Sequence, residues 1–214
     1  MPHYRLSSLL KTATFCLGLA TLAAPAAQAA AYRVANGSPA GTYRIDPDHS
    51  LAWFTVGHAG VAVVTGRFDK MSGTYTVDPA DAAKDRVTVR IVASSLDTNL
   101  AARDHDLQGP DFFNVREYPD IDFTGTRFRS TGRKTGMLYG KLTIRGVTHP
   151  VVFHIREIGA GPVTALPKPW GGYLSGYEGT ASIRRSAFGM GAFAGMIGDV
   201  VHLHVNIEGV RTLP

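Results

Sequence analysis

The sequence predicts an all-β fold, namely a closed antiparallel barrel of about eight strands with one short helix. The first observation is alternation, because apolar and polar residues take turns over segments such as 87–91 and 201–208, as in strands with one buried face. The second is glycine, which makes up 24 of 214 residues and exceeds the average of about 7 %. Glycines inside strands permit the bends of a barrel, and closure removes edges that invite aggregation.

The start of the chain predicts a secretory signal peptide over residues 1–29. Arg5 and Lys11 precede an apolar run over residues 12–25, and Ala27-Gln28-Ala29 matches the small-x-small pattern of a cleavage site. Residues 30–42 are small and turn-rich, which predicts a flexible leader. Residues 43–214 then form one barrel domain. We therefore expect an exported protein.

Composition excludes several classes of protein. Cys16 is the one cysteine of the chain and lies in the predicted signal peptide, which excludes a disulfide scaffold, a thiol enzyme and a cysteine-ligated zinc site. Removing Arg5 and Lys11 lowers the net charge from +5 to +3, which is too mild to indicate a nucleic-acid partner. No other apolar run approaches the ~20 residues of a membrane-spanning helix.

The strands follow one another along the chain, separated by glycine and Asx turns. Alternating segments lie at residues 87–91, 121–124, 141–145, 151–156 and 201–208. Residues 100–107 break this pattern and precede Gly109-Pro110, which predicts a short helix capped by Thr98 or Asn99. We expect this helix to act as a lid over one opening of the barrel.

The inward face of the predicted strands is almost wholly apolar. Its members are Ala52, Phe54, Val56, Phe68, Val87, Val89, Ile91, Ile121, Phe123, Leu142, Ile144, Val151, Phe153, Ile155, Ile183, Leu203, Val205 and Ile207. Two interpretations remain open, because alternation demonstrates a core and not a cavity. Either these side chains fill one another's space, or they line a slot that suits an extended hydrocarbon chain.

An ordered set of motifs over residues 43–208 resembles the YceI-like family. These motifs are Tyr43-Arg44-Ile45-Asp46-Pro47-Asp48-His49-Ser50, Gly66-Arg67-Phe68, Asp111-Phe112-Phe113, Gly140-Lys141-Leu142-Thr143-Ile144 and Arg185-x-x-Phe188-Gly189-Met190. The resemblance implies a lipocalin-like, eight-stranded barrel of the bacterial periplasm that binds polyisoprenoids or other long-chain amphiphiles. Asp106, Arg145 and Ala187 depart from the family pattern, which has histidine, histidine and an acid there.

The predicted ligand-binding residues combine the inward face with the helix and the loop that follows it. They are Phe54, Val56, His58, Phe68, Val89, Ile91, Arg103, Asp104, Phe112, Phe113, Phe123, Leu142, Ile144, Phe153, Ile183, Phe188, Leu203 and Val205. His58 either contacts a ligand head group or is a core histidine. Arg103 and Asp104 either pin the lid or present a guanidinium to the head group. Phe112 and Phe113 are expected to form a stopper that touches ligand.

The sequence indicates no catalytic residue, cofactor or metal site. His202 and His204 share one face of a strand, as a metal-chelating pair would, but no third ligand is evident. Gly189-x-Gly191-x-x-Ala194 fits a dinucleotide fingerprint, yet a strand follows it instead of a helix. The basic residues Arg127, Arg129, Arg133 and Lys134 form either a solvated turn or a contact with anionic lipid.

We expect a periplasmic carrier that sequesters an isoprenoid, prenyl quinone or fatty-acid-like lipid inside the barrel. Its cellular role, whether transport, storage or stress response, stays open, as does its state as a monomer or homodimer. One alternative is an isomerase or hydrolase that uses His58 as a base on a small apolar substrate. Another is a packed barrel that docks on a membrane cytochrome. A membrane surface is a further expected partner.

Overall fold

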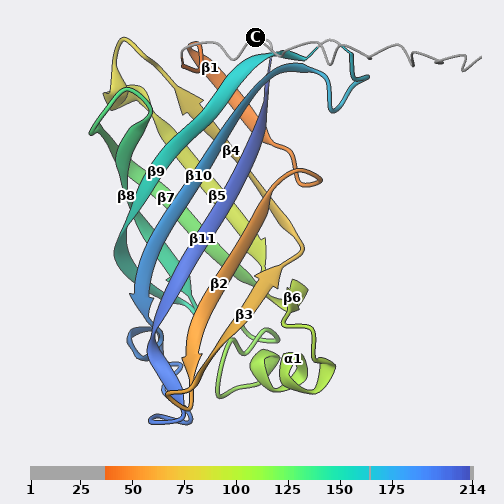
Figure 1. The fold of residues 1–214 in the computed structure, drawn as a ribbon, viewed down its shortest axis with the longest axis vertical. Helices are drawn as coiled ribbons and strands as arrows, with labels where there is room; N and C mark the ends of the chain where they lie inside the picture. Colours follow the sequence, from red (N-terminus) through yellow and green to blue (C-terminus); the bar gives the residue numbers. More distant parts are fainter. Residues whose placement is uncertain (1–36, 164, 213–214) are drawn as a thin grey trace, which may run out of the picture. The chain divides into compact units, whose positions relative to one another are not determined.

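The computed structural model describes residues 37–163 and 165–212. The predicted signal peptide and most of the predicted leader lie outside these residues. The described strands are β1 (Gly41–Ile45), β2 (Leu51–His58), β3 (Ala62–Phe68), β4 (Met71–Val77), β5 (Arg86–Val92), β6 (Leu96–Asp97), β7 (Asp120–Ser130), β8 (Thr135–Ile144), β9 (Val147–Val163), β10 (Gly172–Arg184) and β11 (Ile197–Arg211). All of their pairings are antiparallel, and they form a barrel (Figure 1).

Strand β11 closes the barrel, because it pairs with β10 on one side and with both β1 and β2 on the other. Ile45 of β1 pairs with Gly209, and Leu51 of β2 pairs with Asn206, so the two short strands share one position in the barrel. In the same way, β4 and β3 pair with β1 and β2, and β5 and β6 pair with β4 and β3. Counted by position, the barrel in the described residues is eight-stranded, which confirms the fold predicted from the sequence.

Alternation places apolar side chains on the inner face of the barrel. In β5, the inward Val87, Val89 and Ile91 are half-buried, whereas Thr88 and Arg90 between them are exposed. The inward residues of β11 are likewise half-buried. Because these side chains already face inward, their remaining exposure is toward an interior that protein atoms do not fill.

Some glycines of the barrel leave room for large side chains of the neighbouring strand. At Gly140 in β8, a methyl group would lie 2.4 Å from the Phe123 ring of the neighbouring strand. Phe123 in turn meets Phe153 edge to face, with ring centroids 5.3 Å apart. The register also shifts between Gly125 and Arg127, at a bulge in β7 of the kind that bends a strand.

Helix α1 (Ala101–Gln108) is the α-helix of the described residues, and three short 3₁₀ helices accompany it: η1 (Ala82–Lys84), η2 (Ala93–Ser95) and η3 (Arg185–Phe188). Gly109 follows α1, as predicted, but the predicted cap is wrong. Leu100 is the N-cap and caps with no side-chain hydrogen bond. The Thr98 hydroxyl donates to Asp104 instead (2.6 Å), and Asn99 adopts a left-handed backbone with φ of 62°.

Helix α1 lies at one end of the barrel, at the bottom of the view in Figure 1, together with the β2–β3 turn and the β10–β11 connection. Leu107 of α1 packs against the main apolar cluster of the interior. Over the residues that the structure describes, no helix has the length and apolar character to span a membrane.

Candidate functional site

The barrel encloses a cavity of about 330 Å³, a volume within the ~300–1,000 Å³ range of ligand pockets. Its wall along β11 extends from Ile197 to Ile207, which is roughly 33 Å of strand at ~3.3 Å per residue. The interior is therefore hollow, and the interpretation of a packed core is wrong. A long, narrow, apolar cavity suits an extended hydrocarbon chain better than a compact polar molecule.

Most of the predicted ligand-binding residues line this cavity. They are Phe54, Val56, His58, Phe68, Val89, Ile91, Arg103, Phe112, Phe113, Phe123, Leu142, Ile144, Phe153, Ile183, Leu203 and Val205. Alternate residues of a strand point to the same face of the sheet. The aliphatic side chains of this set therefore meet in the interior of the barrel. Whether they contact a ligand stays a prediction.

Two of the predicted residues, Asp104 and Phe188, are not among the lining residues. Asp104 accepts hydrogen bonds from the backbone N–H and the hydroxyl of Thr98, at 2.8 and 2.6 Å. Phe188 is buried beside the cavity wall, where its ring meets His149 edge to face at 5.0 Å. Both residues therefore have structural contacts that do not involve the cavity.

Arg103 belongs to α1 and also lines the cavity. Its Nε donates to Thr98 Oγ1 (2.7 Å) and its Nη2 donates to the Thr98 carbonyl (2.6 Å). Arg103 and Asp104 thus both hold the buried Thr98 and do not pair with each other. These contacts fix the start of α1 against β6, while the guanidinium still contributes to the cavity lining.

His58 is the last residue of β2 and lies, exposed, at the end of the cavity nearest α1. It is not a core histidine. Among the described residues, no side chain hydrogen-bonds to its imidazole. Contact between His58 and a ligand head group stays a prediction.

Arg185 is a cavity residue whose role sequence reasoning missed. Its side chain is buried, with 5 % of the residue exposed, and it donates to the carbonyls of Gly198 (2.9 Å), Ala192 (2.8 Å) and Ile197 (3.0 Å), and to that of Met190. One guanidinium therefore holds the connection between η3 and β11. The sequence motif contains Arg185, but a motif does not reveal partners that are backbone carbonyls.

The opposite end of the cavity carries tyrosine hydroxyls. Tyr75 and Tyr177 both line it. The Tyr75 hydroxyl bonds to Ser175, and Tyr177 donates to Ser38 (2.7 Å), which donates to the buried Glu157 (3.0 Å). Burial raises the pKa of Tyr177 to about 12, so this hydroxyl is neutral near pH 7. These contacts hold the two tyrosine hydroxyls in place at this end of the cavity.

A closed antiparallel barrel around an apolar cavity defines a hydrophobic ligand-binding protein of the lipocalin-like class. The YceI-like domain family model matches residues 43–209. The chain belongs to the YceI-like family.

Known relatives agree with this assignment. A UPF0312 protein of Pseudomonas aeruginosa is 36% identical over 193 residues, which cover 89% of this chain and 97% of that protein. The solved YceI protein of Campylobacter jejuni is 27% identical, with a TM-score of 0.63 over 71% of this chain and 88% of its own. A polyisoprenoid-binding domain from Saccharophagus degradans shares the fold at 13% identity, with a TM-score of 0.58 over 79% of this chain and 98% of its own.

Proposed function

We propose that the protein is a periplasmic carrier that sequesters a long-chain amphiphile, such as a polyisoprenoid, prenyl quinone or fatty-acid-like lipid, in the barrel. The observation that carries this proposal is the apolar cavity along β11, about 330 Å³ in volume. Each methylene transferred from water into such a wall contributes about 0.8 kcal/mol. The affinity for a chain of several isoprene units therefore increases with the number of carbon atoms that the cavity buries.

The ligand class has support from a protein of the same fold as well as from geometry. The Saccharophagus degradans domain of the same fold is described as polyisoprenoid binding. A branched prenyl chain is apolar and extended, which matches a wall made of aliphatic and phenylalanine side chains. We therefore place prenyl chains first among the candidate ligands.

The α1 end of the barrel is the proposed entrance, with the ligand head near His58 and Arg103. Exposed apolar side chains surround this end: Val61 in the β2–β3 turn, and Phe193 and Met196 in the β10–β11 connection. The two segments are neighbours, because the backbone N–H of Ala59 donates to the Met196 carbonyl (2.6 Å). An apolar rim around the mouth suits contact with the membrane that supplies the amphiphile.

Periplasmic location rests on the predicted signal peptide. N-terminal sequencing of protein from the periplasmic fraction should begin at Ala30. Recovery of the full chain from the cytoplasmic fraction would contradict this part of the proposal.

The alternatives have less support. A packed docking module requires a filled interior, which the cavity contradicts. An isomerase or hydrolase requires His58 to act as an oriented base, and no described side chain hydrogen-bonds to it. No specific observation favours a membrane cytochrome as a partner.

The carrier proposal is tested by measuring binding as a function of chain length. Purified protein is first extracted with organic solvent and the extract is analysed by mass spectrometry, which should reveal a co-purified lipid. Delipidated protein is then titrated with linear fatty acids of increasing length. Affinity should rise by about fourfold per added methylene until the cavity is full. Absence of lipid together with affinity independent of chain length would overturn the proposal.

A further inference from the structure

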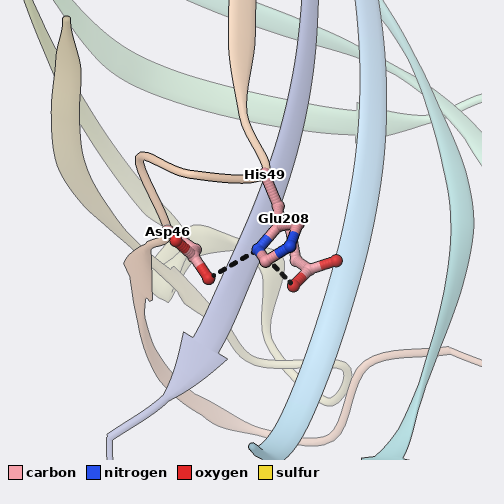
Figure 2. Close-up of side chains that lie close together, drawn as sticks. All are labelled: Asp46, His49 and Glu208. Atoms are coloured by element: carbon pink, nitrogen blue, oxygen red, sulfur yellow. Dashed lines mark hydrogen bonds and ion pairs between the residues drawn. The ribbon is translucent and has the colours of Figure 1, made fainter. Parts of the chain in front are cut away.

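Three side chains with metal-ligating atoms meet on the outside of the barrel seam, away from the cavity. Asp46 follows β1, His49 lies in the β1–β2 turn, and Glu208 belongs to β11 (Figure 2). His49 Nδ1 is 3.0 Å from Asp46 Oδ2 and 3.8 Å from Glu208 Oε1. All three ligand atoms lie within 4.8 Å of one another. None of the three residues lines the cavity.

The backbone holds this cluster in place. The N–H of Asp48 donates to Asp46 Oδ1 (3.0 Å), which leaves Oδ2 facing His49. The N–H of Asp46 donates to the Glu208 carbonyl (2.8 Å), and the N–H of Glu208 donates to Ser50 Oγ (2.9 Å). The turn and β11 are therefore tied together on both sides of the three ligand atoms, independently of any ion.

The spacing of the atoms suits a shared ion. Metal–ligand bonds of about 2.0–2.2 Å in a tetrahedral site place neighbouring ligand atoms roughly 3.3–3.6 Å apart. The observed separations of 3.0 and 3.8 Å lie on either side of this range. Small rotations of the His49 and Glu208 side chains would therefore bring the three ligand atoms to the spacing of a tetrahedral site. The Asp46 side chain is 4 % exposed, whereas those of His49 and Glu208 are 49 % and 32 % exposed. A fourth position is thus open to water.

We propose that Asp46, His49 and Glu208 form a binding site for a divalent transition metal such as Zn²⁺. Two carboxylates balance the charge of the ion, and a neutral imidazole favours Zn²⁺ over Mg²⁺ or Ca²⁺, which prefer oxygen ligands alone. A metal bound to Nδ1 takes the place of the hydrogen bond between His49 and Asp46, and the bound imidazole stays neutral with its one proton on Nε2. The backbone N–H of Asp48 donates to Asp46 Oδ1 and orients the carboxylate, as outer-shell partners do in metal sites.

The pair of histidines that the sequence singled out lacks this arrangement. His202 Nδ1 lies 2.9 Å from Ser182 Oγ, and the His204 ring stacks on Trp53 with centroids 5.1 Å apart. Neither belongs to a cluster of three ligating groups among the described residues. The two histidines therefore supply a matched control on the same strand as Glu208.

Metal bound here links the β1–β2 turn to β11 where β1 closes the barrel. Binding should therefore raise thermal stability, since an ion that binds the folded state alone stabilises it by mass action. This effect does not depend on the proposed carrier function, because the cluster and the cavity share no residue.

The test uses the full mature chain without an affinity tag, stripped of metal with a chelator and dialysed. Calorimetric titration with Zn²⁺ alone should give one site per chain, and the melting temperature should rise with Zn²⁺ concentration. His49→Ala and Glu208→Gln should each weaken Zn²⁺ binding by at least about tenfold, and should reduce the thermal shift at each Zn²⁺ concentration. The double variant His202→Ala/His204→Ala should bind as the wild type does.

Two results would overturn the proposal. The first is no saturable Zn²⁺ binding by the wild type, and the second is binding that His202→Ala/His204→Ala abolishes while His49→Ala retains it. Because His49 and Glu208 are both partly exposed, their variants should fold, and circular dichroism checks this directly. An intact lipid-binding series beside a failed Zn²⁺ titration would refute the metal site and leave the carrier function standing.

Discussion

The ring of Phe113 meets the ring of Phe68 edge to face, with 5.6 Å between centroids and 90° between planes. Phe113 belongs to the loop after α1 and Phe68 ends β3, and both line the cavity. This contact joins the lid to the barrel wall at the proposed entrance. Such aromatic pairs contribute about 0.5–1.5 kcal/mol beyond their buried area.

Replacing Phe113 by alanine should loosen the entrance. We expect the dissociation rate of a fluorescent fatty-acid analogue to rise several-fold in stopped-flow measurements, because the lid loses its contact with β3. Phe113 is half-buried, so the free energy of unfolding should fall by less than the ~3–5 kcal/mol of a fully buried phenylalanine. Leu100→Ala, at an exposed residue just before α1, is the control. Equal dissociation rates for the two variants would refute this role.

Adjacent arginines in the same segment should differ sharply in their effect on stability. Arg185→Met leaves the buried carbonyl of Met190 and three partly buried carbonyls without their donor. A buried carbonyl without a donor costs about 1–3 kcal/mol, so the unfolding free energy should fall by about 3 kcal/mol. Arg184 pairs with Asp199 at the surface, 3.1 Å away, and Arg184→Met should cost no more than about 1 kcal/mol. Urea denaturation measures the unfolding free energy of both variants. Similar losses of stability would contradict the role of Arg185 in holding the β10–β11 connection.

A carboxyl at the cavity should give a measurable pH dependence. Burial raises the pKa of Asp85, and the Asp78 N–H, 2.8 Å from Oδ1, offsets this in part. A folded-state pKa above the unfolded value means that the charged form weakens the fold at pH 7 and that protonation relieves this penalty. Asp85→Asn should therefore be more stable than the wild type at pH 7, and the difference should shrink as the pH falls toward 4. A constant difference would show that this carboxyl is not desolvated.

The fold could be predicted because strand alternation is a local signal. Val87, Val89 and Ile91 face inward as the pattern requires, whichever strands lie beside them. The short helix was predicted for a similar reason, since Gly109-Pro110 ends it. Its cap was not, because the hydroxyl of Thr98 bonds to Asp104 within α1 and to Arg103, and this competition depends on tertiary contacts.

The site was harder to predict, because cavities and clusters depend on long-range contacts. The same inward residues could have filled a core or lined a cavity, and their volumes alone do not decide which. Arg185 binds carbonyls that carry no sequence signature. Asp46 and His49 meet Glu208 only because β11 returns to close the barrel beside β1, whereas spacing along one strand pointed to His202 and His204.

Blocking the cavity tests the central claim most directly. Val205 faces the cavity from β11, and its neighbour Asn206 is exposed on the outer face of the same strand. Calorimetric titration of delipidated protein with a prenyl alcohol should show at least about tenfold weaker binding for Val205→Trp, because the indole occupies the space that the chain needs. Asn206→Trp should bind within twofold of the wild type. Equal affinities for the two folded variants would contradict binding inside the barrel.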